Sequence, residues 1–370
     1  MRFTIEREAF LKPLRAVAGV VERKHTQTSP VLLNVLLKVQ DNHFSLTTTD
    51  QEVELVAEGK LEDPNVENGA VTVPVRKLMD ICKTLPEHEK LTIQEDKERV
   101  TLRAGRSRFT LSTLPVSDFP SLSEKIGNVE FSISKRNLRL LIEQTCFAMA
   151  EQDVRYYLNG MLLEVKDNFV YSVAADGHRM AFGKVELSLK ESKTIRVIVP
   201  RKGILELQRI LGDTEGDIKI ILGDNHIRLI DSDIQLTSKL LEGRFPDYER
   251  IVASEGDKIF VGQREALKES FQRAAALFND RFRGVRLKLT KGLLKILATN
   301  TEQDEVEEDL EIDYKGEELE IGFNIRYLID FLNVIPTDNV RFTFSDANSS
   351  ARVEGVGSDG GIYVIMPMKI

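Results

Sequence analysis

The sequence predicts an α+β protein made of three repeats, each containing two β-α-β-β-β halves. Helix-like segments with the same apolar spacing begin the three thirds of the chain. Phe10, Leu138 and Leu267 occupy the matching place in them, 128 and 129 residues apart. A second phrase also occurs three times, and "VIVPRKGILELQRIL" at 197–211 shows its strand, proline, basic pair and amphipathic helix. A fixed period of this kind is typical of a fold built from copies of one unit.

Six segments have apolar residues at helical spacing. The predicted helices cover 6–24, 74–84, 134–150, 200–211, 263–279 and 324–335. Runs of small residues end the first helix of each third, at 16–19, 148–150 and 274–276. Such residues let another backbone approach closely, so we expect each of these helices to end against a neighbouring element.

Alternating apolar and polar residues predict three strands after every helix. The strand-rich segments are 35–59, 91–112, 161–185, 218–240, 285–312 and 340–367. One half cannot bury both its helix and its sheet face, so two halves should form one domain. Small and charged residues follow a turn at 119–127 and again at 250–258. We therefore predict domains at 1–124, 125–253 and 254–370.

Composition limits the class of protein. A chain of 370 residues with 42% hydrophobic content can bury two or three cores. Its apolar runs are too short to span a membrane, and its start does not resemble a signal peptide. Cys82 and Cys146 lie in helix-like apolar patterns, so we expect buried free thiols in a reducing cytoplasm. The spacing of histidines and cysteines predicts no metal site, and no motif predicts a cofactor.

Charge is divided unevenly between predicted helices and the rest of the chain. The six helices carry 18 Lys and Arg against 9 Asp and Glu, a charge of +9. The whole chain carries −8, so the other segments carry −17. Basic helices repeated at equivalent places favour a polyanion on the helix side, although any single one is equally explained by a solvated face. Since no base-reading motif accompanies them, contact should be with phosphates and independent of sequence.

Seven stretches together carry a family resemblance. They are GRSRFTLSTLPVSDFP (105–120), QDVRYYLNGMLLE (152–164), ADGHRMA (175–181), IVPRKG (198–203), SKLLEGRFPDYERI (238–251), FRGVRL (282–287) and YVIMPMKI (363–370). In this order the chain resembles the bacterial DNA polymerase III beta subunits, the sliding clamps, over essentially all its length. The resemblance implies three clamp-type domains per chain and a head-to-tail dimeric ring, with helices lining the hole and sheets outside.

The function implied by the resemblance depends on topology. The ring would encircle duplex DNA, slide on weak phosphate contacts and tether the replicative polymerase. Other implied partners are clamp-loader subunits, further polymerases and repair proteins, and the implied location is cytoplasmic and nucleoid-associated. Two alternatives stay open: a monomeric or open adaptor, and an enzyme acting at the turn of Asp176 and His178. The sequence offers no nucleophile, base and orienting set, so no catalytic residue is predicted.

The resemblance places a partner-peptide cleft between the second and third domains. Its residues here would be Leu158, Ala175, Gly177, His178, Arg179, Met180, Pro246, Arg250, Ile251, Asn324, Tyr327, Val364, Met366, Pro367 and Met368. Methionines suit an apolar surface that adapts to several partners. Ala175 stands where the family often has threonine, and Ile370 where leucine is usual, which leaves the peptide preference open. Each segment also has a purely structural explanation. The residues around His178 could form a turn in which Gly177 supplies the unusual backbone angle, and the C-terminal tail could be a last strand packed into its own domain.

The resemblance also implies contacts to DNA, although each residue taken alone is better explained as a solvated charge. The set is Lys24, Arg76, Lys77, Lys83, Arg136, Arg139, Gln152, Tyr156, Tyr157, Arg201, Lys202, Lys268 and Arg273. A DNA-contacting arginine of the family falls in the loop before Pro30. Arg23, Lys24 and His25 are the alternatives for it here.

Ring closure would join the first domain to the third domain of another copy. The residues implied are Arg103, Arg106, Arg108, Phe109, Leu111, Ala276, Leu277, Glu302, Asp304, Glu305, Glu307 and Glu308. Phe109 and Leu111 would pack against Ala276 and Leu277, and the arginines would face the acidic run. Exposed ion pairs add little affinity, so the apolar contacts should hold the ring and the charges should fix the pairing.

Overall fold

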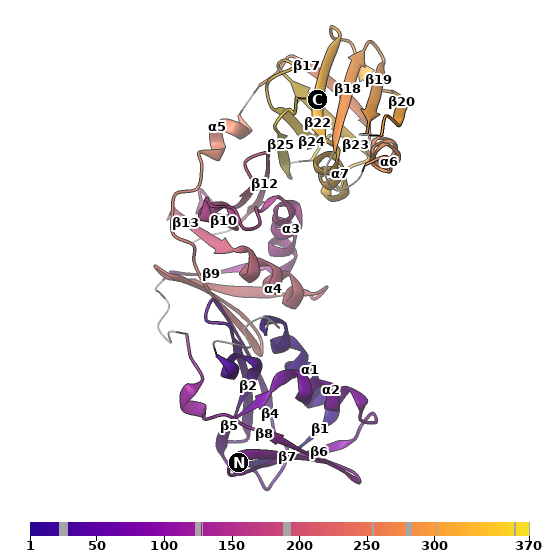
Figure 1. Ribbon diagram of the computed structural model, residues 1–370. Coiled ribbons are helices and arrows are strands. Elements are labelled where there is room, and N and C mark those ends of the chain that lie inside the picture. Colours follow the sequence, from indigo (N-terminus) through magenta and orange to yellow (C-terminus); the bar gives the residue numbers. More distant parts are fainter. Residues whose placement is uncertain are drawn as a thin grey trace. The chain divides into compact units, whose positions relative to one another are not determined.

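The computed structural model describes residues 1–21, 29–122, 127, 129–187, 194–253, 255–278, 283–300, 302–358 and 360–369. The chain forms two compact units, and each is described by itself (Figure 1). The first unit contains Met1–Arg136 and Leu205–Leu240. The second contains Asn137–Ile204 and Leu241–Ile370. The predicted domain limits of 124 and 253 stay a prediction.

The elements follow one another as the repeat predicts. The helices are α1 (Arg7–Val17), α2 (Val75–Thr84), α3 (Lys135–Thr145), α4 (Arg201–Leu211), α5 (Tyr248–Val252), α6 (Arg264–Ala275) and α7 (Ile325–Val334). The first thirteen strands are β1 (Arg2–Glu6), β2 (Asn34–Gln40), β3 (His43–Thr49), β4 (Val53–Lys60), β5 (Gly69–Pro74), β6 (Lys90–Asp96), β7 (Arg99–Ala104), β8 (Ser107–Ser112), β9 (Val129–Ser134), β10 (Gly160–Lys166), β11 (Phe169–Ala175), β12 (Arg179–Glu186) and β13 (Ile195–Pro200).

The remaining strands complete the last third of the chain and the end of the second. They are β14 (Asp217–Leu222), β15 (His226–Asp231), β16 (Ile234–Lys239), β17 (Lys258–Gln263), β18 (Gly284–Thr290), β19 (Leu293–Thr299), β20 (Glu305–Glu311), β21 (Asp313–Tyr314), β22 (Leu319–Asn324), β23 (Asn339–Phe344), β24 (Ala351–Gly355) and β25 (Ile362–Ile365). Each of the six predicted halves is therefore present as strand, helix and three strands, which confirms the α+β repeat.

The two halves of a domain exchange their first strands. β1 pairs with β6 of the following half, with Ile5 opposite Leu91, whereas β5 pairs back with β2. The same exchange joins β9 to β14 and β13 to β10, and it recurs for β17 with β23 and β22 with β18. Neither half has a complete sheet without the other, which is why the halves occur in pairs.

Two long sheets are formed where neighbouring repeats join. In the first unit β4 pairs with β16, giving the order β5-β2-β3-β4-β16-β15-β14-β9. In the second unit β12 pairs with β25, giving β13-β10-β11-β12-β25-β24-β23-β17-β21. We call these two strand pairings the closed seams.

The other two sheets have four strands each and are not extended by a neighbouring repeat. β8 ends the sheet β1-β6-β7-β8 of the first unit, and β20 ends the sheet β20-β19-β18-β22 of the second. We call β8 and β20 the open edges. By repeat position, β20 corresponds to β4 and β12, and β8 corresponds to β16 and β25.

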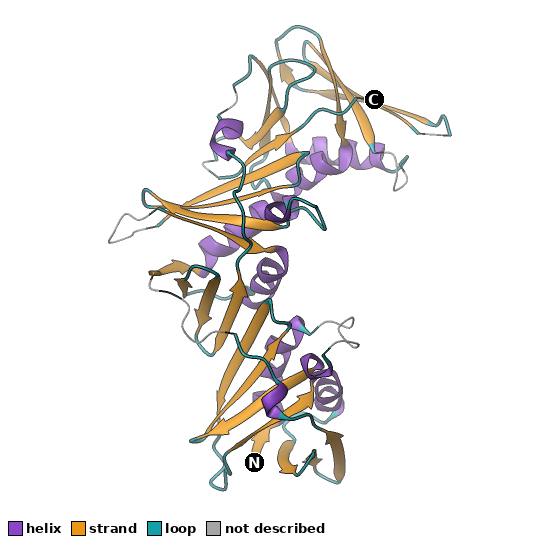
Figure 2. Ribbon diagram, turned by 60° about the vertical axis from the view of Figure 1, so that its left-hand side comes forward, coloured by secondary structure: helices purple, strands orange, loops and turns teal. Residues whose placement is uncertain are grey.

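Helices lie against the sheets, as Figure 2 shows, and their apolar side chains are buried there. α1 buries Phe10 and Leu14, while α6 buries Leu267 and Phe271, so the matching positions of the sequence repeat face the core. Phe10 contacts the ring of Phe44 with centroids 5.8 Å apart. Burial of such side chains contributes roughly 1.5–3 kcal/mol each.

Basic residues at the starts of two of these helices satisfy the ends of their partner helices. Arg7 Nε donates to the Cys82 carbonyl at 2.7 Å, and Arg264 Nη1 donates to the Leu332 carbonyl at 3.3 Å. The last carbonyls of a helix have no partner within it, so a guanidinium there supplies both hydrogen bonds and favourable charge. The equivalent placing of Arg7 and Arg264 is a further mark of the repeat.

The predicted helices run longer than the observed ones at their small-residue ends. α1 stops at Val17 and continues as the 3₁₀ turn Ala18–Val20, and α3 stops at Thr145 before the 3₁₀ turn Cys146–Ala148. Tightening the last turn in this way satisfies carbonyls that an α-helix leaves open. The short helix α5 and strand β21 have no counterpart in the repeat and were not predicted.

The two cysteines are free thiols in different settings. Cys82 is fully buried in α2, as predicted, and burial raises its pKa to about 12. Cys146 is only partly buried and lies in the 3₁₀ turn after α3, not within the helix, so the prediction was wrong in that detail. Burial raises its pKa as well. Neither thiol resembles a reactive nucleophile.

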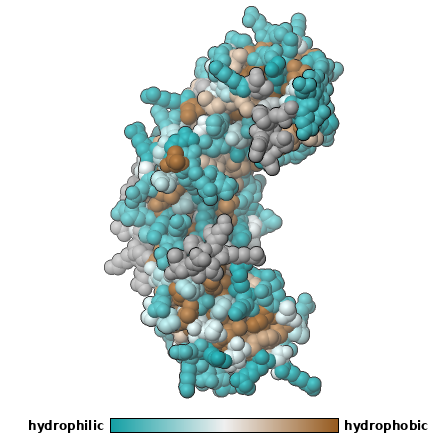
Figure 3. All heavy atoms as spheres, viewed as in Figure 1, coloured by the Kyte–Doolittle hydropathy of each residue, from teal (hydrophilic) through white to brown (hydrophobic). Residues whose placement is uncertain are grey.

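The face of the molecule shown in Figure 3 is mainly hydrophilic, with hydrophobic side chains exposed in scattered patches. No helix among the described residues is both long and apolar enough to cross a membrane.

Candidate functional site

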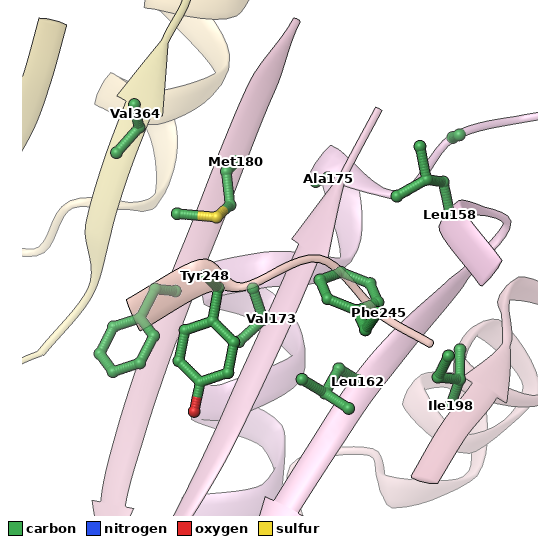
Figure 4. Packing of buried hydrophobic residues seen from close by; sticks show 11 residues of the cluster. Leu158, Leu162, Val173, Ala175, Met180, Ile198, Phe245, Tyr248 and Val364 are labelled. Atoms are coloured by element: carbon green, nitrogen blue, oxygen red, sulfur yellow. The ribbon is translucent and has the colours of Figure 1, made fainter. Parts of the chain in front are cut away.

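Four of the predicted cleft residues meet in one apolar cluster of the second unit. Leu158, Ala175, Met180 and Val364 are all at most 9% exposed and belong to the same packed group (Figure 4). They come from the 3₁₀ turn Tyr156–Leu158 and from β11, β12 and β25. The closed seam brings Val364 directly opposite Met180. Residues as far apart as Leu158 and Val364, more than half the chain, are thus brought together beside the seam.

The sequence did not single out the other members of this cluster. They are Ala150, Leu162, Val173, Phe182, Ile198, Phe245 and Tyr248. Phe245 and Tyr248 flank Pro246 in the stretch RFPDYERI, so their aromatic character was the only available signal. In Figure 4 both rings project from the segment around α5 and lie among the side chains of Met180, Val173 and Leu162.

The turn after β11 has the glycine conformation predicted for it. Gly177 has a φ of +89°, and a side chain there would start 2.5 Å from Arg155 Nη2. Asp176 Oδ1 accepts from the backbone nitrogens of His178 and Arg179 at 2.9 and 3.0 Å. The turn is therefore a closed Asx-type structure. This arrangement explains Asp176 by its backbone contacts and leaves His178 exposed at the surface.

Arg155 is a further residue of the site that was not predicted. Its guanidinium binds Asp153 through two contacts and donates from Nη2 to the Asp176 carbonyl at 3.3 Å. These bonds connect the loop before Leu158 to the turn at Gly177. The sequence signal that could have indicated Arg155 is that it is the basic residue of QDVRYYLNG, a loop that is part of the family resemblance.

Arg179 is fully engaged within the chain. It donates to Asp176 at 3.0 Å, to Asp330 at 2.5 Å and to the Phe147 carbonyl at 2.7 Å. Its guanidinium also lies 4.3 Å from the centre of the Tyr327 ring. The residue therefore joins β12 to α7 and holds Tyr327 in place. Burial raises the pKa of the Tyr327 hydroxyl.

The segment around α5 supplies the exposed side of the candidate cleft. Pro246 and Arg250 are exposed, and Ile251 is 37% exposed. Arg250 pairs with Asp247 at 3.0 Å on the surface, a contact that a ligand could replace at little cost. These residues are open to solvent beside the buried cluster.

The C-terminal tail is fixed by its backbone while its side chains stay open. The Met366 nitrogen donates to the His178 carbonyl at 2.8 Å, and the Met368 nitrogen donates to the Gly322 carbonyl at 2.8 Å. Met366 is 51% exposed and Met368 43%. Asn324 caps α7 by accepting from the Arg326 nitrogen at 3.0 Å. Flexible thioether side chains on a fixed backbone are suited to contacting varied apolar groups.

The predicted DNA-contacting residues differ in exposure. The exposed ones are Arg76, Lys77, Lys83, Arg136, Gln152, Tyr156 and Arg273, and the partly buried ones are Arg139, Tyr157, Arg201, Lys202 and Lys268. Lys24, with its alternatives Arg23 and His25, lies outside the described residues. Tyr156 is 75% exposed and its neighbour Val154 is 86% exposed, so this loop presents apolar side chains to solvent.

Two residues predicted for different surfaces bind each other. Arg273 Nε and Nη2 donate to the two carboxylate oxygens of Glu308 at 2.8 and 2.7 Å. The pairing lowers the pKa of Glu308. Arg273 was predicted to meet DNA and Glu308 to meet a partner's arginines. Within the chain, each charge is already compensated by the other.

The open edges carry opposite charge. On β8, Arg108 stands directly opposite Arg103 of β7, and both are exposed together with Arg106. Like charges facing each other across a strand pair are destabilising. Of the predicted acids on β20 and before it, Glu302, Asp304, Glu305 and Glu307 are exposed, and Glu308 is partly buried. Phe109, Leu111 and Leu277 are partly buried, and Ala276 is exposed.

The described residues hold no cluster of three or more His, Cys, Asp or Glu that could bind a metal ion. In the candidate cleft, Asp176 is occupied in a backbone turn, and Arg179 and Arg250 are occupied in ion pairs. What the arrangement offers is a buried apolar cluster bordered by exposed apolar and charged side chains, which is suited to binding a peptide.

Comparison with known proteins agrees with these features. Sequence models of the DNA polymerase III beta subunit match residues 1–123 for its N-terminal domain, 132–247 for its central domain and 249–369 for its C-terminal domain. The beta sliding clamp of Pseudomonas putida is 54% identical over 370 residues, and the match covers 100% of both chains.

Solved structures match equally completely. The DNA polymerase III subunit beta of Pseudomonas aeruginosa superposes with a TM-score of 0.96 at 54% identity, covering 100% of each chain. A sliding clamp of the same organism bound to griselimycin superposes with a TM-score of 0.95, also at 54% identity over 100% of each chain. The chain belongs to the DNA polymerase III beta subunit family, the beta sliding clamps.

Proposed function

We propose how this chain divides the work of a sliding clamp among three of its surfaces. As a member of its family it is a processivity factor and not an enzyme. It binds duplex DNA, associates with a second copy of itself and tethers polymerases and other proteins through a peptide-binding cleft. The residues that perform each task are the proposal, and the charge and geometry of the open edges carry it most directly.

The ring closes, we propose, when β8 pairs antiparallel with the partner's β20. Both closed seams predict the register of this pairing. Arg179 faces Ile365 and Phe182 faces Ile362 in one seam, and Ser238 faces Val53 and Gln235 faces Val56 in the other. By repeat position, Phe109 corresponds to Tyr363 and Leu236, and Val306 corresponds to Ala181 and Leu55. Tyr363 faces Ala181 and Leu236 faces Leu55, so both seams place Phe109 opposite the partner's Val306.

The same register places Arg108 opposite the partner's Glu307 and Leu111 opposite the partner's Asp304. It would relieve the repulsion between Arg103 and Arg108 by adding an acid to their side of the sheet. Phe109 would add apolar contact, which the exposed ion pairs alone could not replace. Val306 was not among the predicted interface residues, although it is the apolar residue within the acidic run.

DNA contact is proposed for the basic residues of the helices and for the loop of Gln152 and Tyr156. Gln152 has a φ of +57°, and hydrogen bonds between Asp153 and Asn159 hold the loop in shape. Contacts of this kind attach to phosphates without reading bases, so the ring can slide. Arg273 is the weakest of these assignments, because Glu308 already binds it.

The cleft is proposed to bind partner peptides in the apolar cluster, between the C-terminal tail and the segment around α5. Met180 and Val364 would contact apolar side chains, and Arg250 would pair with an acidic group or a carbonyl. We propose that griselimycin binds this chain in the same cleft. Because nucleoid DNA is the partner, we also propose a cytoplasmic, nucleoid-associated location.

Two measurements test the proposal. Light scattering should give a mass twice the 41.9 kDa of the chain, and the protein should stay on nicked circular DNA but leave linearised DNA. A monomer at micromolar concentration would contradict the proposed ring and favour an open adaptor. Calorimetry should show griselimycin binding that Met180→Asp abolishes, whereas Met79→Asp, in α2, would be expected to leave binding intact if the chain folds.

A further inference from the structure

A polar group around one buried carboxylate adjoins the apolar cluster of the proposed cleft, and Tyr248 belongs to both. Glu164 of β10 is 2% exposed, and its Oε2 accepts two hydrogen bonds. Tyr248 Oη donates to it at 2.7 Å, and Arg196 Nε donates at 2.9 Å. The Arg196 guanidinium also lies 5.5 Å from the centre of the Tyr248 ring.

A carboxylate in this position is costly for the fold. Taking a charge out of water is compensated only when a counter-ion and hydrogen bonds replace the water, and apolar replacements are often as stable. Burial, followed by the hydrogen bond to Glu164, raises the pKa of the Tyr248 hydroxyl, so the phenol remains a donor. The three side chains therefore form a constant link between β10, β13 and α5.

α5 depends on such links for its position. It has five residues, and an isolated helix of that length is not stable in water. Its first residue, Tyr248, is held by the bond to Glu164. At its last residue, Val252, the carbonyl accepts a hydrogen bond from Arg352 Nη1 at 3.1 Å. A third contact, between Lys166 and Glu249 at 3.5 Å, is exposed to solvent.

The anchored helix carries the exposed side of the cleft. Pro246 precedes it, and Arg250 and Ile251 belong to it. Figure 4 shows the Tyr248 ring among the apolar side chains of the cluster, with its hydroxyl directed away from Met180. The ring thus contacts the apolar cluster, while its hydroxyl reaches the polar group.

We propose that Glu164 and Arg196 are positioning residues for the cleft. Acting through Tyr248, they hold α5 so that Pro246, Arg250 and Ile251 already lie where a bound peptide needs them. The inference rests on the proposed cleft. Its consequence is that side chains which never touch the ligand determine part of the affinity, because a pre-ordered site loses less entropy on binding.

The test compares three variants of the full-length protein with griselimycin as the probe. Tyr248→Phe and Glu164→Gln keep the shape of each side chain and remove the hydroxyl or the charge. Each should weaken griselimycin binding about five- to tenfold in calorimetry. Lys166→Ala is the matched control, because it breaks an exposed contact between the same strand and helix, and it should change affinity by less than about twofold.

Hydrogen exchange gives a readout that general destabilisation would not produce. Amides of 248–253 should exchange faster in Tyr248→Phe and Glu164→Gln, with protection of the β17 and β23 amides unchanged. The double variant should be no weaker than the weaker single variant, because both remove one linked unit. Arg196→Ala, at a side chain that is 48% exposed, provides a further variant if Glu164→Gln folds poorly.

The outcomes separate the two levels of the argument. If affinity stays unchanged in folded Tyr248→Phe, or falls equally in Lys166→Ala, the positioning role is wrong while the cleft stands. If the unaltered protein does not bind griselimycin at all, the proposed cleft fails and the inference fails with it.

Discussion

The closed seam of the second unit and the two open edges use the same positions of the repeat with different side chains. In the seam, Tyr363 faces Ala181, and at the open edges the corresponding residues are Phe109 and Val306. These positions are apolar in both places. One residue along, Ile362 faces Phe182 in the seam, whereas Arg108 and Glu307 stand at the open edges.

The difference separates a permanent joint from one that must open. Met180–Phe182 of β12 and Tyr363–Ile365 of β25 are buried, so the contact of these strands forms with the fold and is held by apolar area. β8 and β20 alternate exposed and partly buried residues. Charge on one face keeps a strand edge soluble and selects its partner, while the other face supplies modest apolar contact. A ring that has to be loaded onto DNA needs an interface that can open, as the one between β8 and β20 can.

The largest expected effect comes from breaking the closed seam. Tyr363 is 1% exposed and stacks on Phe331 with centroids 5.1 Å apart. Tyr363→Ala should lower the free energy of unfolding of the second unit by about 3–5 kcal/mol, measured by urea denaturation. The Tyr363 hydroxyl has no hydrogen-bond partner in the described part of the chain, so Tyr363→Phe should cost less than about 1 kcal/mol. Equal losses in both variants would contradict this account of the seam.

A charge reversal at the open edge should weaken the ring and leave the chain folded. Arg108→Glu would place an acid opposite the partner's Glu307 and raise the dimer dissociation constant about 100-fold. Glu307→Arg added to the same chain should restore most of the affinity. Sedimentation measures both, and Lys97→Glu, in the turn of the same sheet, serves as the control. Failure of the double variant to recover would show that the proposed register is wrong.

The smallest expected effect concerns the acid that is already paired within its own chain. Arg273 lowers the pKa of Glu308, so the pair stabilises the fold above the ordinary glutamate pKa of 4.5. That contribution is lost as pH falls through the lower pKa of the folded state. Glu308→Gln should cost at most about 1 kcal/mol at pH 7 and nothing near pH 2, because the pair is exposed.

Urea titrations at both pH values measure this difference. Asp309→Asn is the control, since Asp309 lies 3.7 Å from Lys295 in a looser contact and should show a smaller loss. A larger cost for Glu308→Gln at pH 2 than at pH 7 would reverse the assigned direction.

The repeat made the fold predictable, because every half has the same apolar spacing and the same turn positions. The contacts that join distant segments were not predictable in that way. Tyr248 and Glu164 are 84 residues apart, and neither shows a pattern that points to the other. Arg273 and Glu308 were assigned to separate surfaces, because counting charges along helices does not reveal which strand faces them.

The candidate cleft falls between these cases. Met180 and Val364 could be named from the resemblance, whereas their pairing opposite each other is known only from the structure. α5, Tyr248 and Arg155 could not be placed, because they belong to connecting segments that have no equivalent in the repeat. Where a function depends on such segments, periodicity gives no information about them.

The position of β25 has a consequence for how the chain is made. This strand lies between β12 and β24 in the middle of its sheet. Ala181 of β12 therefore cannot pair until Tyr363 of β25 has been synthesised. Until then the edge of β12 is uncovered on the ribosome, with Met180 and Phe182 exposed. Pairings between residues so distant in sequence form slowly and leave edges open to aggregation. Nascent chains of this protein should therefore be clients of chaperones that shield strand edges during translation.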